Sequence, residues 1–182
     1  MSRRRKPCQS ERRGVNTLLQ MRHRPSVHRL QEVLVSHFRS GDAMRSRSVS
    51  GVVLTATVDI PASPARLKAD WQREMVVQMG LEPGDVEALP LARARARWPD
   101  YRRCVAAASG WLHRLGLADA LAGSDTTLMA CRGARYHHDG AQYGGAAFCN
   151  LFLSEDSGLD LHFPFAGHRI PLVRGTVVVF DT

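Results

Sequence analysis

The pattern of apolar and polar positions divides the chain into a helical part followed by a part made of short strands. Residues 49–60 are apolar, β-branched and rich in Thr, which predicts a strand. After Ser63, large apolar residues recur every four positions, the spacing of an amphipathic helix, at Leu67, Trp71, Met75 and Met79. A second helical pattern spans residues 100–115. Gly80 and Gly116 follow the two patterns and mark the expected helix ends.

From residue 125 onward, short β-like segments alternate with turns rich in Gly, Pro and Asp. Six strands are expected, at residues 126–131, 135–139, 147–153, 159–163, 169–173 and 176–181. Short strands separated by turns at this density are typical of an antiparallel barrel or sandwich. Because the helices would pack outside these strands, the predicted class is α+β, with N-terminal helices on a jelly-roll core.

The distribution of charge separates the start of the chain from the rest. Residues 1–50 carry 12 Arg or Lys against 3 Asp or Glu, whereas residues 51–182 carry 13 against 14, so the net charge of +8 belongs to the first segment. A nucleic-acid-binding arm or a targeting peptide would explain such a stretch, although it lacks the apolar core of a secretory signal. We interpret residues 1–48 as a basic, disordered extension. Residues 49–124 would hold a strand and supporting helices, and residues 125–182 the six strands.

Cysteine usage and hydropathy bear on where the protein works. The four cysteines form no Cys-x-x-Cys pair, which indicates free thiols in a reducing cytosol. The chain has no run of 18 apolar residues, so no membrane span is expected. The 23 Arg against 2 Lys favour a bacterial source. These observations predict a cytoplasmic protein without a membrane partner, and the near-neutral folded part makes a nucleic-acid partner unexpected.

One pair of residues suggests metal chemistry. His137 and Asp139 are two positions apart in an expected strand, so both side chains would lie on one face. An imidazole and a carboxylate with open positions beside them suit Fe(II), as two members of a two-histidine, one-carboxylate site. His138 would point to the other face, and we interpret His162 and His168 as ordinary polar residues.

The order of motifs resembles that of the 2-oxoglutarate- and Fe(II)-dependent dioxygenases. His137-x-Asp139 is followed by Asn150-Leu-Phe-Leu-Ser-Glu-Asp-Ser-Gly158, by Leu-Asp-Leu-His-Phe-Pro164 and by Gly175-Thr-Val-Val-Val-Phe-Asp181. The resemblance implies a double-stranded β-helix over residues 125–182, with Fe(II) held by His137 and Asp139. It also implies 2-oxoglutarate as co-substrate, decarboxylated to succinate while a C–H bond of the substrate is oxidised.

Asn150 is the candidate contact for the co-substrate. It alternates with Phe148 and Phe152 along its expected strand, so the three side chains would share one face. If that face is inward, Asn150 would lie in the 2-oxoglutarate pocket and the two Phe side chains would keep the pocket dry. An Asn that bonds backbone groups at a strand end is an equally good interpretation.

The sequence departs from the family pattern at its end. The family places a distal His, and further on a basic residue that pairs with the far carboxylate of 2-oxoglutarate, after the strand that ends here at Asp181. We therefore expect a fragment with an incomplete double-stranded β-helix and little activity, or a short product that gains strands by domain swapping. A non-catalytic cupin-like jelly-roll binding protein is the alternative. The sequence does not define the substrate, small molecule or peptide, or the oligomeric state.

Overall fold

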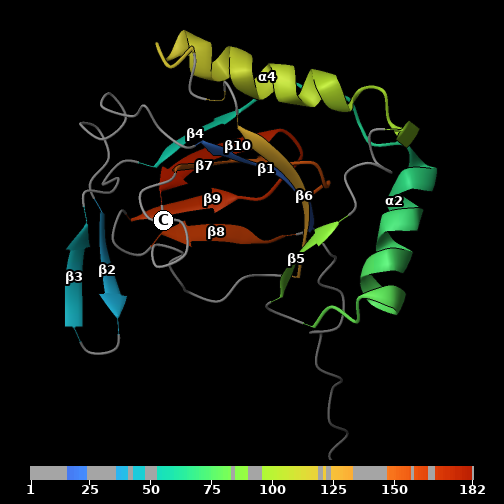
Figure 1. Cartoon of the computed structure of the whole chain (residues 1–182), viewed down its shortest axis with the longest axis horizontal. Coiled ribbons are helices and arrows are strands. Elements are labelled where there is room, and N and C mark those ends of the chain that lie inside the picture. The colour runs from blue at the N-terminus through green and yellow to red at the C-terminus, as the bar shows by residue number, and fades with distance from the viewer. Residues whose placement is uncertain are drawn as a thin grey trace, which may run out of the picture.

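The structure is a computed structural model with an antiparallel sheet at its centre (Figure 1). It describes residues 16–23, 36–40, 43–47, 53–82, 85–89, 96–118, 121, 124–132, 147–156, 158–163 and 167–181. The central sheet has six strands in the order β4-β10-β7-β1-β6-β5, and each neighbouring pair is antiparallel. Its strands are β1 (Asn16–His23), β4 (Leu54–Thr57), β5 (Val86–Leu89), β6 (Asp125–Cys131), β7 (Ala147–Phe152) and β10 (Thr176–Asp181). The predicted α+β class is confirmed.

Two hairpins accompany the central sheet. Strands β2 (Ser36–Ser40) and β3 (Ala43–Arg47) pair with each other and lie to one side in Figure 1. Strands β8 (Asp160–Phe163) and β9 (His168–Pro171) form the second hairpin, which packs on the sheet through an apolar cluster. Because β8 and β9 are the only second layer of strands in the described part of the chain, the jelly-roll core stays a prediction.

The helices cover the opposite face of the sheet, where the predicted amphipathic stripes become buried. Helix α2 (Ala65–Arg73) continues into the π-helix η1 (Glu74–Gln78), and α4 (Tyr101–Arg114) follows later in the chain. The buried side chains of the two α-helices are Leu67, Trp71, Cys104, Ala108, Trp111 and Leu112. They form one core with sheet residues such as Leu19, Leu151 and Val177. Both predicted helices are confirmed.

Strand β1 lies within residues 1–48, the expected disordered extension, and corrects that expectation for residues 16–23. Residues 16–23 lie in the middle of the sheet, where Leu19 is in register with Leu128 of β6 on one side and Leu151 of β7 on the other. Leu18, Leu19 and Met21 are buried. The physical reason is that this short stretch is apolar enough to be buried on both sheet faces, although the surrounding composition is strongly basic.

Gly175 joins the turn before β10 to the segment after β4. Its N–H donates to the carbonyl of Phe152 and its carbonyl accepts from the N–H of Val58, both at 2.9 Å. Its φ of 88° lies in the left-handed region, and a Cβ there would overlap the carbonyl oxygen of Val58. Both the backbone conformation and the close approach of the two segments therefore require glycine.

We expect Gly175→Ala to lower the free energy of unfolding by about 3 kcal/mol, because it combines left-handed strain with overlap. Gly158→Ala is the matched control: its φ is 67°, but no atom lies within 4 Å of the added Cβ, so only the conformational strain, about 1 kcal/mol, remains. Urea unfolding of the two variants measures the difference. An equal loss of unfolding free energy in the two variants would contradict the close approach of Gly175 to Val58.

Candidate functional site

The predicted metal ligands His137 and Asp139 lie outside the residues that the structure describes, as does His138. Their segment directly precedes β7 in the chain. Within the described ranges, no group of three or more His, Cys, Asp or Glu side chains is arranged to hold a metal ion. The metal site therefore stays a prediction.

His162 and His168 are placed on the β8–β9 hairpin. His162 is in register with Arg169, and His168 is in register with Phe163. Leu161 and Phe163 pack against the sheet cluster, so by strand alternation His162 faces the other side of the hairpin. Both histidines are half-buried. Neither belongs to a metal-binding group of described residues, and their interpretation as ordinary polar residues stays a prediction.

Asn150 lies in the middle of the central sheet, on the face that looks toward the β8–β9 hairpin. It is in register with Gln20 of β1 on one side and Val178 of β10 on the other. Phe152 and Val178 belong to the cluster under the hairpin, which identifies this face. The shared face of Phe148, Asn150 and Phe152 therefore follows from the regular strand, and it is directed inward.

The side chain of Asn150 is nearly inaccessible to solvent and incompletely satisfied. Only 7% of its surface is exposed, and Oδ1 has no hydrogen-bond partner in the part of the chain that the structure describes. Oδ1 thus makes none of the backbone bonds that a purely structural role would use. A buried acceptor left without a donor destabilises a protein by about 1–3 kcal/mol. This makes Oδ1 a candidate acceptor for a ligand N–H or O–H group.

Cys149, the residue before Asn150 in β7, lies on the other face of the sheet. Cys149 points to the helix-covered face, where it belongs to the main core. Burial raises the pKa of its thiol to about 12. The thiol is therefore protonated at neutral pH, which makes it a poor nucleophile.

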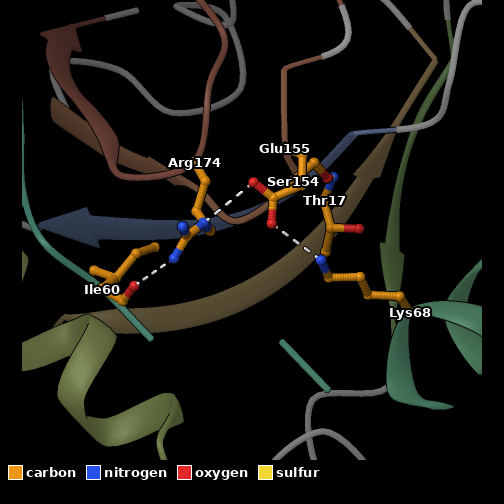
Figure 2. Close-up of polar contacts among 6 residues, drawn as sticks. All are labelled: Thr17, Ile60, Lys68, Ser154, Glu155 and Arg174. Carbon is orange, nitrogen blue, oxygen red and sulfur yellow. Dashed lines mark hydrogen bonds and ion pairs between the residues drawn. The ribbon is translucent and has the colours of Figure 1, made fainter. Parts of the chain in front are cut away.

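A polar network fixes the strands that carry the site (Figure 2). The backbone N–H of Thr17 in β1 donates to Ser154 Oγ at 2.7 Å, and its carbonyl accepts from the N–H of Leu153 at 2.8 Å. These bonds tie the start of β1 to the segment that follows β7. They hold the two strands in the register that places Gln20 opposite Asn150.

The next residue extends the network to the helix layer and to the turn before β10. Glu155 accepts from Lys68 of α2 at 3.1 Å and from Arg174 Nε at 3.3 Å. Arg174 also donates through Nη1 to the carbonyl of Ile60 at 2.8 Å, as Figure 2 shows. The hydrogen bond from Lys68, together with the positive charges of Lys68 and Arg174, lowers the pKa of Glu155.

Sequence reasoning singled out Asn150 as a candidate but not the residues opposite it in the sheet. Gln20 of β1 is in register with both Asn150 and Thr127 of β6. Gln20 lies in a segment whose composition indicated a disordered tail, and its partners follow more than a hundred residues later in the chain. No local pattern connects these positions, so only the strand pairing brings them together.

Comparison with protein-family models, with curated proteins and with solved structures finds no match to this chain. Among the described residues, no helix is long and apolar enough to cross a membrane. The assignment of a function therefore depends on the sequence motifs and on the arrangement of the site.

We expect Asn150→Leu to leave the free energy of unfolding unchanged or to raise it by up to about 1 kcal/mol, because it replaces an unpaired buried acceptor with an apolar group of similar size. Leu151→Ala is the matched control on the helix-covered face: Leu151 is fully buried, and its truncation should cost about 2–5 kcal/mol. Chemical unfolding of both variants tests the contrast. A loss above 2 kcal/mol for Asn150→Leu would show that its amide has a structural partner.

The lowered pKa of Glu155 predicts a pH-dependent contribution to stability. The ionised carboxylate stabilises the fold at pH values above the ordinary Glu pKa of 4.5, and this contribution is lost as the pH falls through the lower pKa of the folded state. Because the side chain is 58% exposed, the effect should stay below about 1 kcal/mol and shrink in salt.

Glu155→Gln should therefore be less stable than the unmodified chain at pH 7 and equally stable at pH values below the folded pKa. Glu87→Gln, at an exposed carboxylate of β5, provides the control for loss of a negative charge. Thermal unfolding across the acid range measures both variants. A difference for Glu155→Gln that persists unchanged in strong acid would rule out ionisation as its source.

Proposed function

We propose that this chain is an Fe(II)- and 2-oxoglutarate-dependent dioxygenase, which oxidises a C–H bond of its substrate. The observation that carries the proposal is the order of elements around the His137-x-Asp139 motif. Five of the six strands expected from the family pattern form where the sequence predicts them, as β6, β7, β8, β9 and β10. The sixth expected strand holds the motif itself and lies outside the described residues.

The proposed fold is a double-stranded β-helix. In this arrangement the central sheet forms one side of the core and the β8–β9 hairpin begins the other. Support comes from the apolar cluster between them, in which Ile170 of β9 packs with Phe152 and Val178 of the sheet. The sheet face inside this cluster is the face that carries Asn150.

His137 and Asp139 would hold the iron, the first through a neutral imidazole and the second through a carboxylate. Protons compete with the metal for both groups, so iron affinity should fall as the pH is lowered. Asn150 would donate from Nδ2 to an oxygen of 2-oxoglutarate. Its burial on the inward face of β7 supports a ligand contact through Nδ2 and leaves Oδ1 open to a second, donating group. Bound iron and 2-oxoglutarate supply the oxidising chemistry, and the protein orients them and excludes water.

Aromatic side chains on the same face would exclude that water. The ring of Phe180 lies 5.9 Å from that of Phe148 and 5.3 Å from that of Phe163, measured between centroids. The three rings thus form a continuous apolar wall between the sheet and β8. A dry wall beside the co-substrate favours oxidation of the substrate over side reactions with water.

The experiment is an anaerobic titration of the folded chain with Fe(II) in the presence of 2-oxoglutarate, followed by the visible charge-transfer absorption of the chelated metal. We expect His137→Ala and Asp139→Ala each to weaken iron binding by at least about tenfold, because each removes a ligand. His162→Ala and His168→Ala are matched controls and should bind iron normally.

Two results would contradict the proposal. If both ligand variants bind iron as the unmodified chain does, the metal is held elsewhere. If the folded chain binds no Fe(II), the alternative of a non-catalytic jelly-roll binding protein is favoured. Conversion of 2-oxoglutarate to succinate in air, absent in both ligand variants, would extend the result from binding to catalysis.

A further inference from the structure

Three polar side chains form a row across the sheet face that looks toward the β8–β9 hairpin. Gln20 of β1 is directly opposite Thr127 of β6 and directly opposite Asn150 of β7. Directly opposed residues in antiparallel strands project to the same face, with Cβ atoms about 4.5–5.5 Å apart. We call Thr127, Gln20 and Asn150 the amide row.

The amide row borders an apolar row on the same face of the sheet. The neighbouring row places Leu18 between Met129 and Phe152, and all three belong to the cluster beneath the hairpin. Asn150 is buried, whereas Gln20 and Thr127 are half-buried. The row therefore runs from a buried position on β7 to more accessible positions on β1 and β6.

The unsatisfied atom in the row defines the ligand's chemistry. Asn150 Oδ1 is an acceptor without a donor among the described residues, so its partner must carry an N–H or O–H group. Ionised 2-oxoglutarate offers only acceptors and does not meet this requirement. Gln20 adds donors beside this acceptor, since its carboxamide carries an NH₂ group. The pair thus suits a ligand with a donor and an acceptor on one edge.

We infer that the amide row binds a primary carboxamide or lactam of the substrate. The N–H of the ligand donates to Asn150 Oδ1, and its carbonyl oxygen accepts from Gln20 Nε2. A primary amide or a lactam presents both groups on the same edge, whereas a trans peptide bond directs them to opposite sides. The assignment of this amide to the oxidised substrate rests on the proposed function; the binding of the amide does not require iron.

The test uses the metal-free full chain and benzamide, whose ring can pack on the Phe side chains beside the row. Two analogues separate the contribution of the N–H group from that of the amide geometry. Acetophenone keeps the ring and the carbonyl but has no N–H. N-methylbenzamide has an N–H, but in the trans geometry of a peptide. We expect benzamide to bind with a roughly millimolar dissociation constant, as befits a ligand of its size, and to shift the NMR signals of the Asn150 and Gln20 side-chain amides. Both analogues should bind at least about fivefold more weakly.

Variants locate the site. Asn150→Leu and Gln20→Met should each weaken benzamide binding by at least about fivefold, with unchanged circular dichroism. Thr55→Val is the matched control, because Thr55 of β4 is opposite Val178 and its hydroxyl donates to the carbonyl of Val177. Gln20→Met keeps the test informative if Asn150→Leu fails to fold. Equal binding of acetophenone, or normal benzamide binding in both amide-row variants, would overturn the inference.

The failure of this inference is distinguishable from the failure of the proposed function. A chain that binds benzamide at the amide row but binds no Fe(II) retains the amide site and is not a dioxygenase. A chain that binds Fe(II) through His137 and Asp139 but does not bind benzamide is consistent with the dioxygenase and overturns the amide site. Equal binding of N-methylbenzamide and benzamide would overturn the preference for a primary carboxamide or lactam.

Discussion

The insertion of β1 between β6 and β7 is the constraint on which the rest of the structure depends. Seven register pairs join β1 to β6 and six join it to β7, so this strand joins the β4-β10-β7 half of the sheet to the β6-β5 half. Buried backbone N–H and C=O groups require hydrogen-bond partners. A strand at this position provides partners for the backbone groups of both β6 and β7. The helix layer depends on the same strand, since Leu19 and Met21 belong to its core.

The register of β1 determines which of its side chains face the helices and which face the β8–β9 hairpin. Because side chains alternate along a strand, a slip by one residue would exchange the two faces and bring Leu19 to the position of Gln20. Thr17 donates to Ser154 and accepts from Leu153, and these two bonds fix the start of β1 against the segment after β7. The ion pairs of Glu155 then connect this segment to α2 and to the turn before β10. The bonds of the buried Thr17 and the surface ion pairs of Glu155 thus support the register that sets which side chains face the hairpin.

The parts of the fold that the sequence predicts are those with local signals. The stripe of Leu67 and Trp71 identified α2, and short apolar segments between Gly and Asp turns identified β6 to β10. Strand β5 gave no such signal, since three of its four residues are exposed. Strand β1 was missed because its basic surroundings concealed a segment whose burial depends on distant partners. The jelly-roll core and the metal pair at His137 and Asp139 remain predictions.

The same distinction explains what could be foreseen of the site. Alternation along one strand was enough to place Asn150 beside Phe148 and Phe152 on an inward face. Its pairing with Gln20 and Thr127 arises from contacts between segments more than a hundred residues apart, which no periodicity encodes. Sequence patterns thus specify faces of individual strands, while a binding site composed of several strands is specified by their pairing.

The two faces of the sheet differ in the polar groups that they bury. The face under the helices is closed by apolar side chains, and its thiol at Cys149 is held protonated by burial. The opposite face buries an unsatisfied amide oxygen beside an apolar cluster, a feature that lowers stability in the absence of a donor. A fold that depends only on packing would place an apolar residue there. The proposed amide row gives this acceptor a role in recognition, and β1, which joins the two halves of the sheet, supplies the Gln20 side chain beside it.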